Sequence, residues 1–312
     1  MDLGYHRKDL LGLEDLTPNE IQFFLDTARS FKEILERPQR KVPTFRGKTV
    51  LSLFFEPSTR TRMSFELAAK RLSADTVSVA KATSSVKKGE TLLDTMKNME
   101  AMKVDVIILR HESPGAAHFL ARHTEASVIN AGDGPHEHPT QALLDLFTVR
   151  EKLGTLEGIK LAIVGDILHS RVARSNLFGF TKMGAEVMLV GPPPLVPKSF
   201  ERYGARISHS VDEALEWADV VMALRIQKER LGESFFGSDR EYRRFFGITK
   251  ERVQKVNRQF VLMHPGPVNW HVELDPEVVD LLDTVILEQV TNGVAIRMAI
   301  LYALLARGGT SS

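Results

Sequence analysis

The sequence contains no cysteine among its 312 residues. That absence excludes a disulfide framework, a thiolate metal site and a cysteine nucleophile. An excess of either charge is also missing, because 41 lysines and arginines nearly balance 40 aspartates and glutamates, for a formal net charge of +1. A balanced charge provides no general attraction for nucleic acid or for an anionic membrane, so we expect neither partner.

Long apolar runs are missing as well. The first ten residues, MDLGYHRKDL, carry charges where a signal peptide has an apolar core. No uninterrupted apolar run elsewhere reaches the length that is needed to cross a bilayer. We therefore expect no membrane segment and, by default, a cytoplasmic location.

Hydrophobic periodicity predicts a helix near the start of the chain. Thr17 precedes Pro18 and stands three residues before Glu20, which is the arrangement of a capping box. The residues predicted to share the buried face of this helix are Ile21, Phe24, Leu25, Ala28 and Phe31.

Short apolar runs then alternate with helical patterns in two series. Strands that alternate with helices favour parallel sheets built from βαβ units. We therefore predict an α/β fold with two doubly wound parallel-sheet domains joined by a helix, and an active site in the cleft between them. The predicted strands are 48–55, 75–80, 104–110 and 126–132 in the first series and 159–166, 185–192, 219–225 and 260–267 in the second.

The length of the chain also favours two domains, because single cores rarely exceed roughly 250 to 300 residues. The expected domains are 1–149 and 150–292, with a C-terminal helix of about 293–312 packing back on the first domain. The joining helix is predicted at 139–154, with a buried stripe of Leu143, Leu146, Phe147 and Leu153.

The segment FFEPSTRTRMSFE, residues 54–66, directly follows a predicted strand. In open α/β sheets, ligands bind where the carboxyl ends of strands meet loops and helix N-termini. The N–H groups and positive dipole at a helix start attract anions, and hydroxyl and guanidinium groups strengthen such a site. Arg60 lies in the first turn and can reach a phosphate, whereas Arg62 lies about 200° away around the helix. The alternative is a well-capped helix with solvated arginines.

Three motifs, in this order along the chain, resemble the carbamoyltransferase family. They are the segment at 54–66, HPTQALLDLFT at 138–148 and MHPGPVN at 263–269. The resemblance covers nearly the whole chain and is closest to the members that use aspartate as acceptor. It implies transfer of the carbamoyl group of carbamoyl phosphate to the amino group of L-aspartate, in pyrimidine biosynthesis, without a cofactor.

The resemblance also implies which residues bind carbamoyl phosphate. In the family, Arg110 reaches phosphate and carbonyl oxygen, His138 donates to the carbonyl oxygen, and Gln141, one helical turn later, holds the carbamoyl amide. The S-T-R-T motif, which holds the phosphate, corresponds here to Ser58, Thr59, Arg60 and Thr61. The implied catalytic residues are Arg60, Thr61, Arg110 and His138.

A metal site is an alternative role for His136 and His138, because they form an H-x-H pair. No third histidine or carboxylate stands at a convincing ligand spacing along the sequence. We therefore expect no metal.

The second half of the chain is expected to bind the acceptor. The segment GDILHSRVARSN, 165–176, follows a predicted strand but lacks the glycine spacing of a dinucleotide fingerprint, which disfavours a nucleotide-binding oxidoreductase. By resemblance, Arg171 binds a carboxylate of aspartate, and Arg225 and Gln227 are further ligands. Bidentate arginine pairing suits a dicarboxylate.

The loop at 263–269 distinguishes members of the family. Ornithine carbamoyltransferases carry a cysteine in the corresponding H-C-L-P segment, so ornithine or another amino acid is the less favoured acceptor. The resemblance implies that the backbone carbonyls of Gly266 and Pro267 accept hydrogen bonds from the carbamoyl amide. Many relatives have an arginine after V-N, where this chain has Trp270 and then His271.

The polar segment SSVKKGET, residues 84–91, is by itself typical of a solvated turn. In the aspartate-specific members, the matching serine and second lysine, here Ser84 and Lys88, enter the active site of the neighbouring subunit, where Lys88 also contacts aspartate. The resemblance thus implies a homotrimer with shared active sites. It leaves a regulatory chain or a dihydroorotase partner open. A catalytically silent assembly protein is disfavoured, because every expected ligand is present.

Overall fold

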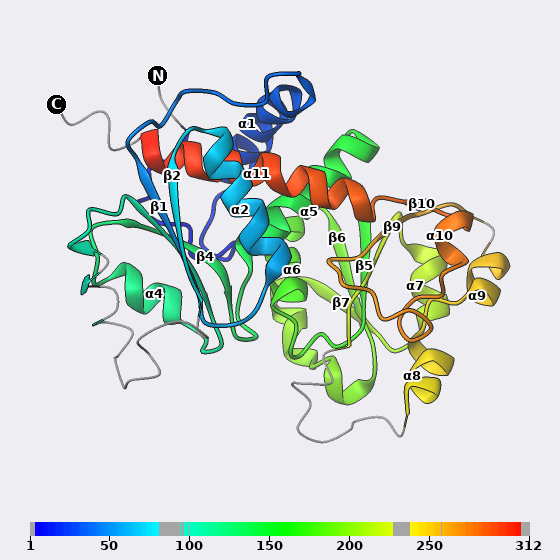
Figure 1. Ribbon diagram of the computed structural model, residues 1–312. Coiled ribbons are helices and arrows are strands. Elements are labelled where there is room, and N and C mark those ends of the chain that lie inside the picture. Colours follow the sequence, from blue (N-terminus) through cyan, green and yellow to red (C-terminus); the bar gives the residue numbers. More distant parts are fainter. Residues whose placement is uncertain are drawn as a thin grey trace. The chain divides into compact units, whose positions relative to one another are not determined.

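The computed structural model describes residues 4–80, 94, 97–98, 100–226, 238–256 and 258–306 (Figure 1). Contacts divide the chain into two compact units. Unit 1 is Met1–Phe147 with Thr291–Ser312, and unit 2 is Thr148–Val290. Each unit contains its own parallel sheet, so the predicted α/β fold with two parallel sheets is confirmed.

The sheet of unit 1 has the strand order β2-β1-β3-β4, and all its pairs are parallel. Helix α2 (Thr59–Arg71) connects β1 to β2, and α4 (Ala116–Ala121) connects β3 to β4 in the opposite direction along the sheet. Right-handed crossovers in opposite directions place their helices on opposite faces, which makes the sheet doubly wound (Figure 1). The strands are β1 (Thr49–Phe54), β2 (Asp75–Ala80), β3 (Val106–His111) and β4 (Ser127–Asp133).

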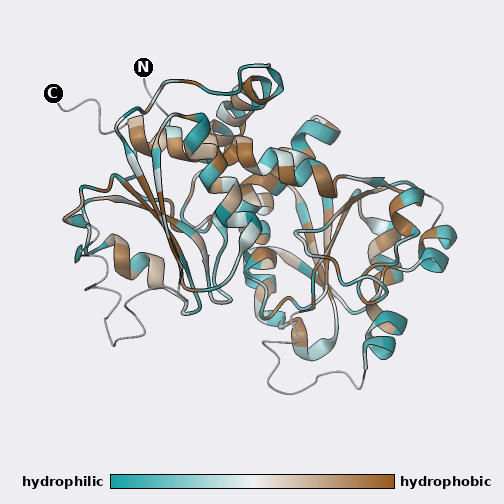
Figure 2. Ribbon diagram, in the orientation of Figure 1, coloured by the Kyte–Doolittle hydropathy of each residue, from teal (hydrophilic) through white to brown (hydrophobic). Residues whose placement is uncertain are grey.

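The apolar core of unit 1 follows from the two-residue period of its strands. Leu51 and Leu53 of β1 and Ile107 and Leu109 of β3 belong to one apolar cluster with residues of α4, and each is at most 1% exposed. The strands of both sheets are predominantly hydrophobic in Figure 2, as expected for strands that are covered on both faces.

Helix α1 (Pro18–Glu36) begins at the predicted residue. Thr17 Oγ1 accepts a hydrogen bond from Glu20 N at 3.2 Å, and Glu20 Oε2 accepts one from Thr17 N at 2.8 Å, so the capping box is confirmed. The five residues predicted to share its buried face are all buried.

The sheet of unit 2 has the order β10-β9-β8-β5-β6-β7 and is also parallel throughout. Sequence patterns missed β7 and β10, because both are short edge strands. The strands are β5 (Lys160–Val164), β6 (Glu186–Val190), β7 (Ala205–Ser208), β8 (Val220–Ala223), β9 (Val261–Met263) and β10 (Asp283–Thr284). The helices are α6 (Arg171–Lys182), α7 (Val211–Trp217), α8 (Asp239–Phe246), α9 (Lys250–Lys255) and α10 (Val278–Leu281), with 3-10 turns η3 (Pro193–Leu195) and η4 (Lys198–Tyr203).

Two helices continue from one unit into the other along the chain, α5 (Pro139–Leu153) and α11 (Ile286–Ala306). The predicted burial of Leu143, Leu146 and Phe147 on α5 is confirmed. The prediction for Leu153 was wrong, because this residue ends the helix and is 37% exposed.

Helix α11 is long and apolar enough to cross a membrane by length and composition, the one such helix in the part of the chain that the structure describes. A search for uninterrupted apolar runs in the sequence does not find α11, because polar residues interrupt its apolar residues. In the fold, 72% of its apolar window is buried, which is typical of a core helix.

Candidate active site

Several predicted site residues lie in or directly after the strands at which each sheet reverses its winding direction. In unit 1, residues 58–61 follow β1, and Phe54 at the end of β1 pairs with Arg110 of β3. In unit 2, Arg171 begins the helix after β5 and Arg225 follows β8, the strand beside β5. Open α/β sheets bind ligands at such switch points, beyond the carboxyl ends of the strands.

The start of α2 has the features of an anion site. Ser58 is the N-cap residue, but its side chain makes no capping hydrogen bond, and its Oγ donates instead to Thr61 Oγ1 at 3.0 Å. Thr59 and Arg60 are exposed, whereas Thr61 is buried. The N-cap hydroxyl therefore accepts no hydrogen bond from the N–H groups of the first turn. Hydroxyl and guanidinium groups lie at the same helix end as the positive end of the dipole.

An irregularity between β3 and β4 positions Arg110. The strand pairing shifts register between Leu109 and His111, where β4 contains one extra residue. Bulges of this kind turn groups out of the regular ladder. Arg110 Nη1 donates to Ala131 O within the bulge at 3.1 Å, and Arg110 Nη2 lies 3.7 Å from Glu56 Oε1. The guanidinium is thus held beside the loop that leads into α2.

His138 and Gln141 lie at the start of α5, where they are 5% and 9% exposed. The backbone N–H of Gln141 donates to His138 O at 3.0 Å, which places both residues in the first turn. Gln141 Nε2 donates to Asp145 Oδ1 at 3.0 Å. This bond engages one of the two N–H groups of Nε2, and the amide oxygen is the acceptor of the side chain.

Sequence reasoning missed Arg297 of α11, which supports α2 within unit 1. Its Nη1 donates to Ser64 Oγ at 2.9 Å and Gly293 O at 3.0 Å, and its guanidinium lies 5.1 Å from the centre of the Phe65 ring. Burial lowers the pKa of Arg297 to about 10, and the attraction of Asp145 opposes that change, so the group stays cationic at neutral pH. No local pattern signals this residue, because it lies 233 positions from Ser64.

In unit 2, a glycine allows the two arginine-bearing segments to approach. Gly165 directly follows β5 with a φ of 144°, and a Cβ at this position would lie 2.9 Å from Leu224 Cβ. Leu224 precedes Arg225, and Gly165 begins the loop to Arg171, the buried first residue of α6. The switch point therefore brings these two segments side by side.

The loop after β9 is held by a buried His264–Glu273 pair. Gly266 N donates to His264 Nδ1 at 2.8 Å, so the proton of the neutral imidazole is on Nε2, which lies 3.3 Å from Glu273 Oε1. Glu273 Oε1 also accepts from Asn269 N at 2.6 Å. These bonds set the backbone around Gly266 and Pro267, whose peptide bond is cis.

The same loop contacts the chain after β8, because Asn269 Nδ2 donates to Ile226 O at 3.4 Å. The two residues that depart from the family pattern come next. Trp270 is 46% exposed, and His271 adopts a φ of 64°. Three predicted ligands lie outside the described residues, namely Ser84, Lys88 and Gln227.

The H-x-H pair does not form one group of ligands. Among the described residues, two clusters bring potential metal ligands close together, and both contain His136 but not His138. One ligand of each cluster, His118 or Glu14, comes from a distant part of the chain, where sequence spacing could not identify it.

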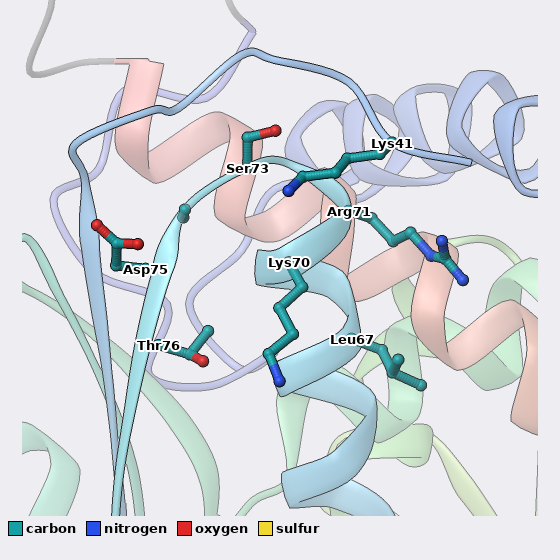
Figure 3. Close-up of a pocket in the computed structure, with 8 residues that line it drawn as sticks. Lys41, Leu67, Lys70, Arg71, Ser73, Asp75 and Thr76 are labelled. Carbon is teal, nitrogen blue, oxygen red and sulfur yellow. The ribbon is translucent and has the colours of Figure 1, made fainter. Parts of the chain in front are cut away.

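An open pocket of about 620 Å³ lies at the other end of α2 (Figure 3). The cationic ends of Lys41, Lys70 and Arg71 point in different directions there, and Lys70 pairs with Glu66 at 2.6 Å. The negative end of the helix dipole is at this terminus, so Lys70 and Arg71 offset it. An anionic substrate therefore fits this pocket poorly. Its lining is Lys41, Leu67, Lys70, Arg71, Ser73, Ala74, Asp75 and Thr76.

Two family models match the chain, one in each half. Residues 8–151 match the carbamoyl-P binding domain of the aspartate/ornithine carbamoyltransferases, and residues 157–304 match their Asp/Orn binding domain. The aspartate carbamoyltransferase catalytic subunit of Pelotomaculum thermopropionicum is 59% identical over 307 residues, which cover 98% of this chain and 99% of the relative.

Solved structures of both kinds of transferase have the same fold. The catalytic subunit of M. jannaschii aspartate transcarbamoylase is 35% identical, with a TM-score of 0.85 and coverage of 98% and 100% of the two chains. The Trypanosoma cruzi aspartate transcarbamoylase in complex with aspartate and phosphate is 29% identical, with a TM-score of 0.83 and 95% coverage of each chain. Ornithine carbamoyltransferase from Pyrococcus furiosus is 28% identical and also reaches a TM-score of 0.85, covering 96% and 97%. Fold similarity alone therefore does not identify the acceptor.

Proposed function

The chain belongs to the aspartate/ornithine carbamoyltransferase family, and we propose that it transfers the carbamoyl group of carbamoyl phosphate to the α-amino group of L-aspartate. The products are N-carbamoyl-L-aspartate and phosphate, and the reaction belongs to pyrimidine biosynthesis. The observation that carries the proposal is that a different anion-binding arrangement lies at the switch point of each sheet. Unit 1 has the open start of α2, and unit 2 has the buried Arg171.

Unit 1 is proposed to bind carbamoyl phosphate. The first turn of α2 supplies N–H groups and the helix dipole to the phosphate, and Ser58, Thr59, Arg60 and Thr61 add hydroxyl and guanidinium donors. Arg110 bridges phosphate and carbonyl oxygen, His138 donates to that oxygen, and Gln141 accepts from the carbamoyl amide. The hydrogen bond from Gln141 Nε2 to Asp145 supports the last role, because it engages the nitrogen and not the amide oxygen of the side chain.

Unit 2 is proposed to bind aspartate through Arg171 and Arg225, with Gln227 as a further ligand. A guanidinium binds a carboxylate through two parallel hydrogen bonds, so two arginines suit a dicarboxylate. The carbonyls of Gly266 and Pro267 accept from the carbamoyl amide. The His264–Glu273 pair holds the loop that carries these carbonyls, which favours that role.

The chemistry requires one bond to form and one to break. The neutral α-amine attacks the carbamoyl carbon, and negative charge develops on the carbonyl oxygen. Thr61, Arg110 and His138 stabilise this oxyanion, and one well-placed donor typically contributes about 3 to 4 kcal/mol. The bond to the phosphate oxygen then breaks, and the phosphate leaves with the amine proton. No covalent bond to the protein forms.

The acceptor is the part of the proposal that an assay tests directly. We expect carbamoylation of L-aspartate and negligible carbamoylation of L-ornithine when both are offered side by side with carbamoyl phosphate. Arginines at the acceptor site repel the side-chain ammonium of ornithine, and the chain lacks the cysteine of the H-C-L-P segment. Comparable rates with the two amino acids would show that the assignment is wrong.

The proposal extends to a homotrimer in the cytoplasm in which Ser84 and Lys88 enter the neighbouring subunit's site. One further cation there offsets the repulsion between two anionic substrates. The test mixes the inactive variants Arg60→Ala and Lys88→Ala under conditions of subunit exchange, with each unmixed variant as control. Random assembly gives roughly a quarter of sites with both native residues. Recovery near that fraction supports shared sites, and no recovery contradicts them.

A further inference from the structure

We infer that His118, Asp133 and His136 form a binding site for one divalent transition-metal ion in unit 1. His118 comes from α4, Asp133 is the last residue of β4, and His136 lies in the turn before α5. Each residue offers one ligand atom, and these atoms all lie within 4.8 Å of one another. The imidazole rings of His118 and His136 have centroids 5.7 Å apart at an angle of 65°.

The spacing of Asp133 and His136 already suits an ion. His136 Nδ1 lies 3.1 Å from Asp133 Oδ2. Two ligand atoms at about 2.0 to 2.1 Å from one ion, in tetrahedral or octahedral geometry, are roughly 2.9 to 3.4 Å apart. An ion can therefore take the place of the proton that His136 Nδ1 shares with the carboxylate, and that proton leaves to solvent.

His118 can complete the group at little cost. Its Nδ1 is buried and has no hydrogen-bond partner in the described structure. The His118 ring has to rotate so that the distances from its ligand atom to those of Asp133 and His136 shorten by roughly 1 to 2 Å, which is the spacing of ligands around a bound ion. No hydrogen bond of Nδ1 is broken when the ring turns.

Neighbouring donors hold the Asp133 carboxylate, which is 1% exposed, in place. Oδ1 accepts from Asn130 Nδ2 at 2.8 Å and Glu137 N at 3.1 Å, and Oδ2 accepts from Gly115 N at 2.7 Å. Hydrogen bonds to ligating carboxylates are characteristic of metal sites, because they fix the orientation of the ligand.

The ligand set indicates the class of ion. Two imidazoles and one carboxylate, with no thiolate, suit Zn²⁺, Co²⁺, Ni²⁺ or Cu²⁺, whereas Mg²⁺ and Ca²⁺ prefer sites made of oxygen atoms. Three protein ligands leave a coordination position for water. The ion would tie α4 to the segment that leads to His138.

A second cluster, formed by Glu14, His136 and Glu137, competes for the same histidine. There, Glu137 Oε2 accepts from Leu13 N at 2.8 Å and Oε1 accepts from Glu14 N at 3.2 Å. This cluster offers one imidazole rather than two, and its Glu14 is exposed, whereas every ligand of the cluster with His118 is at least partly buried. The cluster with His118 is therefore the favoured site.

The test uses the full chain after treatment with a chelator and desalting. Titration with Co²⁺ should give visible absorption bands that saturate at one ion per chain and disappear when Zn²⁺ is added. Calorimetry should give a Kd for Zn²⁺ in the micromolar range or tighter, and the melting temperature should rise on saturation. Absence of binding, or a Kd for Zn²⁺ above about 1 mM, overturns the inference.

Variants identify the ligands. His118→Ala and His136→Ala should each weaken Zn²⁺ binding about 100-fold, whereas His123→Ala should leave it unchanged. His123 is the matched control, because it lies close to α4 and bonds to Phe119 O through Nδ1 at 2.7 Å. Equal affinity in all variants indicates an adventitious ion only. Loss of binding in Glu14→Gln but not in His118→Ala assigns the ion to the second cluster. Either result overturns the inference, and circular dichroism verifies that each variant is folded.

Discussion

The helices that follow the first central strand of each sheet begin in different ways. At the start of α2, the hydroxyl of the N-cap Ser58 donates to Thr61 and caps nothing. At the start of α6, the N-cap Ser170 accepts a hydrogen bond from Ala173 N at 3.1 Å. The side chain of Ser58 thus accepts from no N–H group in the first turn of α2, whereas Ser170 caps α6.

The arginines at the two helix starts also differ in how exposed they are. Arg60 is exposed in the first turn of α2, whereas Arg171, the first residue of α6, is only 3% exposed. A phosphate dianion requires many donors, which a helix start and several side chains supply together. One carboxylate requires a single guanidinium in a fixed orientation, which burial provides. The two helix starts therefore suit the two substrates proposed above.

The largest expected effect tests the open start of α2. Arg60→Ala should lower kcat/KM for carbamoyl phosphate by about 10³-fold, because it removes a charged donor to the phosphate. The melting temperature should change by less than about 2 °C, since an exposed side chain contributes little to folding. Steady-state kinetics and calorimetry measure the two quantities.

Arg62→Ala is the matched control, because Arg62 lies on another side of the same helix. It should act through stability, with a smaller loss of activity. A large fall in melting temperature for Arg60→Ala with activity retained would instead favour a purely structural role for Arg60.

The next effect tests the buried guanidinium of α6. Arg171→Lys should lower kcat/KM for aspartate by about 10²-fold, because an ammonium cannot form two parallel hydrogen bonds to a carboxylate. The affinity for carbamoyl phosphate, measured by calorimetry without aspartate, should stay within about twofold. An equal loss for both substrates would contradict the division of roles between the two helix starts.

A smaller effect tests the loop after β9, where a side-chain pair rather than a helix positions the ligand groups. Glu273→Gln should lower kcat about 10-fold, because it weakens the bonds that hold His264 and Asn269 N. Asp275→Asn, two residues away, should affect stability through Arg243 without the same loss of kcat. Equal kcat values in the two variants would argue against a positioning role for Glu273.

The smallest effect compares the two caps directly. Ser170→Ala should lower the free energy of unfolding by about 1 kcal/mol, because it removes a capping hydrogen bond, and Ser58→Ala should lower it by only a few tenths. Ser58→Ala should instead raise the KM for carbamoyl phosphate. Urea denaturation with matched kinetics measures both changes, and equal stability losses would show that Ser58 also caps its helix.

Much of the fold was predictable because many of its elements follow local patterns. The capping box of α1 involves residues three apart, and the runs that became β1, β3, β5 and β8 are apolar and short. Several predicted site residues, among them Arg60 and Arg171, follow these strands at the edge where parallel sheets bind ligands. Leu153 was misassigned, because periodicity indicates the face of a helix but not where its burial ends.

The sequence by itself determined the helices, most of the strands and the residue types at their carboxyl ends, since these depend on neighbours a few positions away. Only the tertiary structure decided the strand orders, the bulge that aligns Arg110 with Ala131 O, and the contact between Arg297 and Ser64. It also brought His118 close to His136. These arrangements depend on which strands become neighbours and in what register, and that choice reflects the packing of the whole core rather than any local pattern.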